Sequence, residues 1–158
     1  MTALPPPRLY DPKADKWLLD SIAQLHIDCI TQDHTLATFL PPLSHSKVLA
    51  SWQVWSDQVE NGSRVMMLQM APAGSGDNPL PQHPSGEIIL AGVVSLSFPD
   101  TETGSHRSEV GRLFTSPDFR RRGVARRLMV ALEPIAVERE RWLMVSPAAT
   151  IPEVVHVI

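Results

Sequence analysis

The sequence predicts an α+β fold in which a mixed, mostly antiparallel sheet is flanked by helices. Two segments with apolar residues at helical spacing come first, one over residues 12–31 and one beginning near Ser44. Three runs that read as strands follow, the middle one apolar and β-branched, and a loop then leads into a further amphipathic helix and a last short strand. Because consecutive strands most often pair with each other, the three runs predict a meander with helices packed against it.

The first helix is expected to follow a short strand at residues 8–10. Asp11 is the candidate N-cap, and Pro12 takes the first helical position, where its missing N–H costs nothing. The apolar face of this helix consists of Leu18, Ile22, Leu25 and Cys29. The spacing predicts a helix over residues 12–31 whose lone cysteine serves core packing.

The second helix is expected to begin after Ser44, which is a candidate N-cap. Pro41 and Pro42 exclude regular helix before it, while Asn61 and Gly62 end it. Its apolar face consists of Val48, Trp52, Trp55 and Val59. Two tryptophans at this spacing predict a core contact.

Strands are predicted at residues 64–71, 87–98 and 107–116, with a last one at 142–145. Gly92 is expected to mark a bulge inside the second of these strands. Residues 72–86, rich in Gly, Pro and Ser, are expected to form a flexible loop of a hairpin.

Composition limits the range of functions. A length of 158 residues fits one domain, and 43% hydrophobic with 20% charged residues is an ordinary globular composition. No apolar run is long enough to cross a membrane, and the first twenty residues lack a secretory pattern, so we expect a cytoplasmic protein without a membrane partner. The net charge of −3 argues against a general polyanion-binding role.

One stretch, SPDFRRRGVARRLMVALE at residues 116–133, concentrates positive charge at a predicted helix N-terminus. Its arginines are Arg120, Arg121, Arg122, Arg126 and Arg127. Backbone N–H groups at a helix N-terminus lack acceptors, and the helix dipole adds positive potential there. Gly123 leaves room for an anion to approach these groups. The stretch therefore predicts a site for a ligand such as a diphosphate.

The loop resembles the acyl-CoA pyrophosphate loop, R/Q-x-x-G-x-G/A, of the GNAT family of N-acetyltransferases. Here the pattern runs from Arg120 to Ala125 and every fixed position is met. The order of predicted elements is also the family's, and the likeness extends over residues 8–144. Within the family, residues 37–55 and 105–144 look like the subgroup that includes the tabtoxin-resistance acetyltransferases.

The resemblance implies a binding site for acetyl-CoA as co-substrate. Leu113, Phe114 and Thr115 would offer main-chain groups to the pantetheine arm. The pyrophosphate would be held, chiefly by N–H groups, at Arg120, Arg121, Arg122, Gly123, Val124, Ala125 and Arg126. The side chains of Arg120 and Arg126 would assist.

The resemblance also implies a reaction. Glu109 matches a carboxylate that removes a proton from the substrate amine, which is mostly protonated at neutral pH. The acetyl group would pass directly to a primary amine of a small molecule in a ternary complex, without a metal. From its surroundings alone, Glu109 is equally compatible with a surface ion pair, because Arg107 and Arg112 stand beside it.

The tail, residues 145–158, departs from the family. Relatives continue with a further helix and strands, and a tyrosine there commonly protonates the leaving thiolate, whereas the only tyrosine here is Tyr10. We therefore expect a truncated domain that lacks the last helix and strands. The β-branched VVHVI segment is expected to pair with an open sheet edge, either in this chain or in a homodimer.

Two alternatives to an N-acetyltransferase stay open at this point. The chain could be a catalytically impaired acyl-CoA-binding protein, or a polyanion-binding module that uses the basic patch at residues 119–127. The acidic net charge and the scarcity of nearby aromatic residues, apart from Phe114 and Phe119, argue against a nucleic-acid partner.

Overall fold

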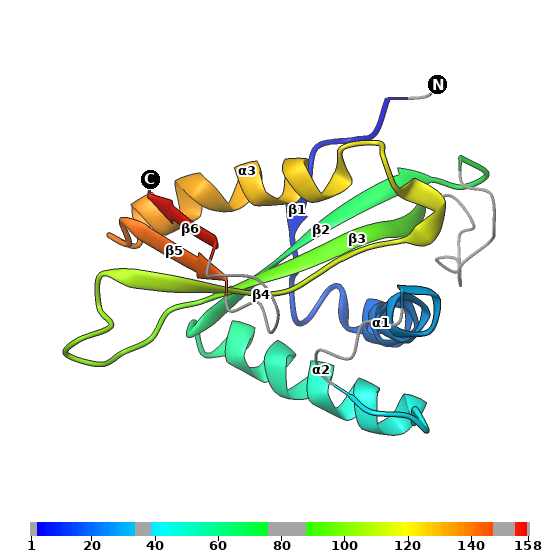
Figure 1. The fold of residues 1–158 in the computed structure, drawn as a ribbon, viewed down its shortest axis with the longest axis horizontal. Coiled ribbons are helices and arrows are strands. Elements are labelled where there is room, and N and C mark those ends of the chain that lie inside the picture. Colours follow the sequence, from blue (N-terminus) through cyan, green and yellow to red (C-terminus); the bar gives the residue numbers. More distant parts are fainter. Residues whose placement is uncertain (1–2, 34–38, 76–87, 147–153, 158) are drawn as a thin grey trace.

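A computed structural model describes residues 3–33, 39–75, 88–146 and 154–157. Its helices are α1 (Leu19–Asp33), α2 (His45–Glu60) and α3 (Val124–Glu138), with 3₁₀ turns η1 (Lys16–Leu18) and η2 (Pro117–Phe119). Its strands are β1 (Arg8–Leu9), β2 (Arg64–Pro72), β3 (Ile88–Ser97), β4 (Arg107–Thr115), β5 (Leu143–Ser146) and β6 (Val154–Val157). They form one sheet in the order β1-β2-β3-β4-β5-β6 (Figure 1).

The sheet is antiparallel except for the parallel pair β4 and β5, which α3 connects. Helices α1 and α2 lie on one face and α3 on the other (Figure 1). Each face has its own core: Ile22 and Trp52 are fully buried on the first, and Leu128 and Leu132 on the second. This arrangement confirms the predicted α+β fold with a mostly antiparallel sheet between helices.

The first helix begins later than its apolar spacing predicts. It starts at Leu19, and residues 16–18 form a 3₁₀ turn. Asp11 does bind two backbone N–H groups, those of Lys13 and Ala14, but it caps a turn. Before the helix, the buried Asp15 carboxylate accepts two hydrogen bonds from Arg8, at 2.6 and 2.8 Å, and one from the Asp11 N–H at 2.9 Å, which hold this segment in a turn.

The second helix and the three long strands lie close to their predicted positions. Ser44 is the N-cap of α2, with its hydroxyl oxygen accepting from the Lys47 N–H at 3.4 Å, and Gly62 follows the helix at a φ of 80°. The predicted bulge at Gly92 is confirmed, because the pairing of β2 with β3 skips one residue between Gly92 and Leu90. Helix periodicity and turn chemistry are local, which is why these predictions hold.

Strands β4 and β5 pair along only part of their length. The paired residues are 107–109 and 143–145, and β4 continues to Thr115 without β5. A second bulge lies in β4, where Gly111 pairs with Ser95 and Phe114 pairs with Val93. Arg112 inside this bulge has a φ of 50°. The described part of the sheet therefore has an unpaired stretch of β4 edge beside the start of α3.

The tail contributes a strand, and its pairing within the chain is one of the two outcomes expected for the β-branched VVHVI segment. Residues 154–157 form β6, antiparallel to β5, so this segment completes the sheet of its own chain. Most of the predicted flexible loop at 72–86 lies outside the described residues, as do residues 147–153 of the tail. None of the described helices has the length and apolar character needed to cross a membrane.

Candidate functional site

A pocket of about 510 Å³ opens beside the unpaired end of β4 and the N-terminus of α3. Its lining comes from three segments that are distant in sequence: α1, the end of β4, and the loop that enters α3. The lining residues are Cys29, Leu113, Phe114, Thr115, Phe119, Arg120, Arg121, Gly123, Val124, Ala125 and Arg126. The pocket thus collects every residue predicted for acyl-CoA binding except Arg122.

The loop between β4 and α3 is anchored to β3 and to the core beneath it. The Ser116 N–H donates to the Ala91 carbonyl at 2.9 Å, and the fully buried Phe119 anchors η2 in the core. Arg121 and Gly123 both have left-handed backbones, with φ of 59° and 74°. Helix α3 begins at Val124 without any side-chain cap on its first N–H groups. Successive turns of this kind aim backbone N–H groups into one concavity that suits an anion.

Two glycines near this loop differ in the space around them. A Cβ placed on Gly123 would meet no atom within 4 Å, so the space in front of the loop is open. A Cβ on Gly92 would lie 2.7 Å from Cγ1 of Val124 and 2.9 Å from the Phe114 carbonyl oxygen. Gly92 therefore lets α3 begin close against β3, while Gly123 leaves room at the loop that a ligand can use.

The five arginines of the basic stretch separate into two groups. Arg120, Arg121 and Arg126 line the pocket. Arg122 donates to the Ser75 carbonyl at 2.7 Å and lies over the Phe119 ring, and Arg127 donates to Gln69 at 3.0 Å and to the Pro5 carbonyl at 2.7 Å. Arg122 and Arg127 thus fasten neighbouring segments of the chain.

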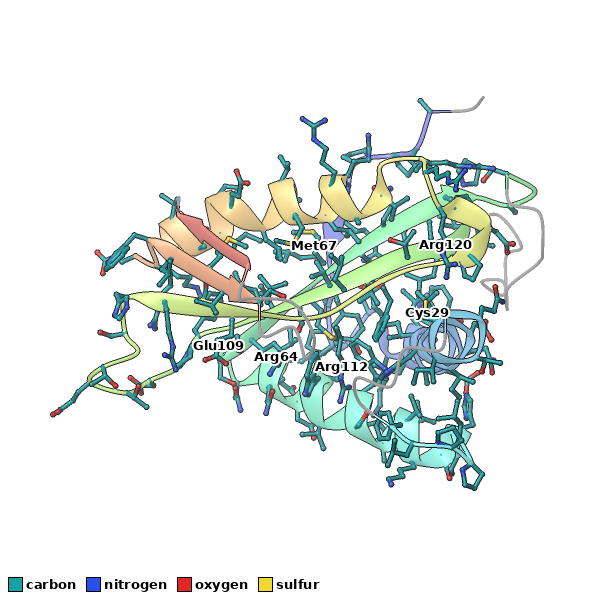
Figure 2. The ribbon with its side chains drawn as sticks, in the orientation of Figure 1. Cys29, Arg64, Met67, Glu109, Arg112 and Arg120 are labelled. Carbon is teal, nitrogen blue, oxygen red and sulfur yellow. The ribbon has the colours of Figure 1, made fainter. Side chains whose placement is uncertain are left out.

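Cys29 is a lining residue that the sequence does not reveal. It is buried, as its helical spacing predicts, and its thiol lies 3.5 Å from the Thr115 carbonyl oxygen. Helix α1 brings it to the end of β4 (Figure 2). No local motif surrounds Cys29, so only the packing of α1 on β4 could place it here.

The predicted catalytic residue lies outside the pocket lining. Glu109 is on β4, three residues before Arg112 of the bulge, and its carboxylate lies 3.2 Å from Arg107 with 39% of the side chain exposed. The ion pair that the sequence left open is therefore present. Tyr10 is buried, with its hydroxyl 2.9 Å from Ser56 Oγ, so it has a structural role.

A second group of polar side chains lies between the sheet and α2, near the same bulge. Arg64 of β2 and Arg112 of β4 are neighbours there, and Glu109 lies beside Arg64 (Figure 2). Burial lowers the pKa of both arginines to about 10. The sequence did not predict this pair, because its members belong to strands far apart in the chain.

Comparison with known proteins gives a consistent result. Residues 76–151 match the model of the acetyltransferase (GNAT) family. An acetyltransferase of Trypanosoma brucei is 19% identical, with a TM-score of 0.54, over 94% of this chain and 84% of that one. A protein of Clostridium acetobutylicum, described as a predicted acetyltransferase and solved with acetyl-CoA, is 18% identical, with a TM-score of 0.59, over 94% and 82%.

A third solved structure, the ribosomal-protein-alanine N-acetyltransferase of Brucella melitensis, is 18% identical with a TM-score of 0.59, over 89% of this chain and 72% of that one. A search of curated proteins gave no match. At this level of identity the solved structures establish the fold, which is that of the GNAT acetyltransferases.

Proposed function

We propose that this chain, which has the GNAT acetyltransferase fold and a GNAT family match over residues 76–151, is an acetyl-CoA-dependent N-acetyltransferase. The observation that carries the proposal is the pocket beside β4, which brings together nine of the ten residues assigned to acyl-CoA binding from sequence, all but Arg122. The solved Clostridium acetobutylicum protein of the same fold contains acetyl-CoA, which supports the same co-substrate here.

The proposed binding mode follows from the geometry of the loop. The pyrophosphate would accept hydrogen bonds from the N–H groups at the start of α3, where Gly123 leaves open space. Arg120, Arg121 and Arg126 line the same pocket and would supply positive charge. The pantetheine arm would lie along residues 113–115, where β4 has no β5 partner. The acetyl end would then point toward the bulge at Arg112.

In the proposed reaction the acceptor amine attacks the carbonyl carbon of the thioester. A C–N bond forms, the C–S bond breaks, and the amine loses one proton. We assign Glu109 as the base that accepts this proton, directly or through a water molecule. Its place on β4, three residues before Arg112 of the bulge and partly exposed to solvent, supports the assignment. Since Tyr10 is buried against Ser56, we expect water to protonate the departing thiolate.

The acceptor in this proposal is a primary amine of a small molecule, as the resemblance to the tabtoxin-resistance subgroup implies. An acyl-CoA-binding protein without catalytic activity is the second candidate. It is favoured by one observation, that Tyr10, the only tyrosine, is committed to the core. Turnover with a panel of amines separates the two candidates once acetyl-CoA binding is established.

The experiment that tests the proposal is a calorimetric titration with acetyl-CoA of the parent chain, Gly123→Val and Gly62→Val. Gly62 is a matched control, because both glycines have left-handed backbones and open space around their Cβ positions. Both variants should lose similar stability, about 1–2 kcal/mol, through backbone strain. Only Gly123→Val should weaken acetyl-CoA binding, by at least about tenfold, or ~1.4 kcal/mol.

Thermal melts of all three proteins establish that they are folded. A parent chain that is folded but does not bind acetyl-CoA would refute the proposed function. Equal binding by the parent and Gly123→Val would instead show that the loop is not the pyrophosphate site.

A further inference from the structure

Two arginines from different strands meet around one tryptophan between the sheet and α2. The guanidinium carbon of Arg64 lies 3.7 Å from the centre of the Trp55 ring, and that of Arg112 lies 3.9 Å from it. Arg112 also lies 4.8 Å from the Trp52 ring. Arg64, Arg112 and Trp55 are half-buried, whereas Trp52 is fully buried. The aromatic rings hold the two guanidinium groups in place, and solvent still reaches these groups.

The hydrogen bonds of this arginine pair, Arg64 and Arg112, go to neutral groups. Arg64 donates to Gln58 Oε1 at 2.7 Å and to Ser95 Oγ at 2.9 Å. Arg112 donates to Ser51 Oγ at 3.0 Å. Each guanidinium group has five N–H donors, so both retain donors for a ligand.

Among the described residues, the arginine pair forms no direct ion pair, and Glu109 is the one carboxylate whose charge acts on it, by raising the pKa of Arg64, which burial lowers. In the part of the chain that the structure describes, neither guanidinium group lies within 4.0 Å of a carboxylate, and the nearby Glu109 forms its ion pair with Arg107. Burial lowers the pKa of Arg112, and the charge of Arg64 lowers it further. Two like charges that are partly removed from water destabilise each other unless an anion joins them.

The backbone at Arg112 is strained in a way that fixes its position. Arg112 lies in the β4 bulge with a φ of 50°, a conformation that costs a residue with a side chain about 1–2 kcal/mol. The next two residues, Leu113 and Phe114, line the pocket assigned to the acyl donor. The arginine pair therefore stands next to the place where the acetyl end of the donor would lie, on the side of Glu109 (Figure 2).

We propose that Arg64 and Arg112 bind a carboxylate of the acceptor, so that the substrate is an amino-acid-like amine whose carboxylate fixes the position of its amino group. The inference rests on the proposed acetyltransferase function and specifies its substrate class. Planar guanidinium groups suit a carboxylate because they offer parallel N–H donors. The alternative role of the arginine pair, fastening α2 to the sheet through Trp55, needs no ligand and predicts that its variants impair acceptors with and without a carboxylate equally.

The test compares amino acids with their amides as acceptors, since the amide keeps the amine and removes the negative charge. The variants are Arg112→Gly, which also suits the left-handed backbone, and Arg64→Gln. Arg139→Gln is the matched control, because Arg139 also lies over an aromatic ring, that of Phe98 at 4.9 Å, and donates to a neutral group, the Gly62 carbonyl, but stands outside the arginine pair.

Each variant of the arginine pair should raise KM for amino acids by at least about tenfold, the effect of losing one hydrogen bond to a charged group. KM for the amides and the affinity for acetyl-CoA should stay within about twofold of the parent. Arg139→Gln should leave KM for amino acids, KM for their amides and the affinity for acetyl-CoA unchanged. A parent enzyme that prefers amides, or variants that impair both substrates equally, would overturn the inference.

A second measurement is independent of turnover. N-acetyl amino acids and their amides are titrated into the parent and variant chains, with and without CoA. We expect the parent to bind the acids more tightly than the amides, and Arg112→Gly to abolish this preference. Absence of any preference in the parent would reject the arginine pair as a carboxylate site. Absence of acetyl-CoA binding would reject the acetyltransferase function instead, so the two failures are distinguishable.

Discussion

At the scale of single residues, not every arginine of the basic stretch contributes its charge to the pocket. Arg122 stands between two pocket-lining residues, yet its guanidinium group binds the Ser75 carbonyl. Arg127 does the same with Gln69 and Pro5. The remaining positive charge of the pocket is therefore smaller than the basic stretch indicates. The backbone N–H groups at the start of α3 gain importance for binding a diphosphate.

The residue-scale prediction concerns Glu109. Replacing it with Gln keeps the shape of the side chain and removes the basic carboxylate, so kcat should fall by about 10²-fold or more. Acetyl-CoA affinity, measured by calorimetry, should not change, because Glu109 does not line the pocket. Glu102→Gln, at an exposed position in the same part of the chain, is the control. An unchanged kcat in Glu109→Gln would show that Glu109 is not the base and that its role is the ion pair with Arg107.

At the scale of elements, β4 and α3 together make the pocket, and each contains one departure from regular geometry. The bulge at Arg112 interrupts the pairing of β4 with β3, just after the pairing of β4 with β5 ends at Glu109. Pro134 lies inside α3, where it cannot donate the hydrogen bond that the Val130 carbonyl would accept. The bulge is next to the proposed reacting atoms, whereas Pro134 is exposed and far along the helix.

The element-scale prediction is that Pro134→Ala stabilises the chain. Alanine restores the missing backbone donor and has the highest helix propensity, so the free energy of unfolding should rise by about 1–3 kcal/mol. Urea denaturation measures this change. Val137→Ala, at an exposed position of the same helix, should have a much smaller effect. Loss of stability in Pro134→Ala would show that the proline ring itself contributes a contact that outweighs the missing hydrogen bond.

At the scale of the whole molecule, His26 joins three elements. It lies on α1, its Nδ1 accepts from Trp52 Nε1 on α2 at 3.2 Å, and its ring lies against Phe114 of β4, with ring centres 4.3 Å apart. Nε2 is buried without a hydrogen-bond partner among the described residues. Burial, and to a lesser degree the charge of Arg112, lower the pKa of His26 to about 4. The packing of both helices on this face of the sheet therefore depends on a neutral histidine.

The molecule-scale prediction follows from the sign of that shift. The unfolded chain binds a proton at His26 below about pH 6.5, whereas the folded chain resists protonation until about pH 4. Stability is therefore fully retained above pH 6.5 and falls as the pH decreases toward 4, with His26 contributing a loss of about 1–3 kcal/mol.

Urea denaturation of the parent and of His26→Gln at pH 7.5, 5.5 and 4.5 isolates this contribution. The carboxylates of the chain titrate in both proteins, so the difference between their pH dependences belongs to His26. Equal pH dependence in the two proteins would contradict the prediction, whatever the stability of His26→Gln at neutral pH.

Much of the site could be predicted because its recognition elements are contiguous in the chain. The run from Arg120 to Arg126 contains the turn, the glycine and the helix start, and each depends on neighbours within a few residues. The same holds for the N-cap at Ser44 and for the strands of the meander. The late start of α1 does not follow from apolar spacing, because that spacing says nothing of the ion pair between Arg8 and Asp15 that holds the preceding segment in a turn.

The sequence by itself determined the order of helices and strands, the fold class and the anion-binding loop, since periodicity, capping and turn chemistry act over a few residues. Only the tertiary structure decided which side chains from other segments of the chain join this loop at the site. It brought Cys29 from α1 to the pocket, and it placed Arg64 beside Arg112 across the intervening strand β3. The reason is physical: sheet register and bulges set the face on which each side chain lies, and these depend on partners far away in the chain.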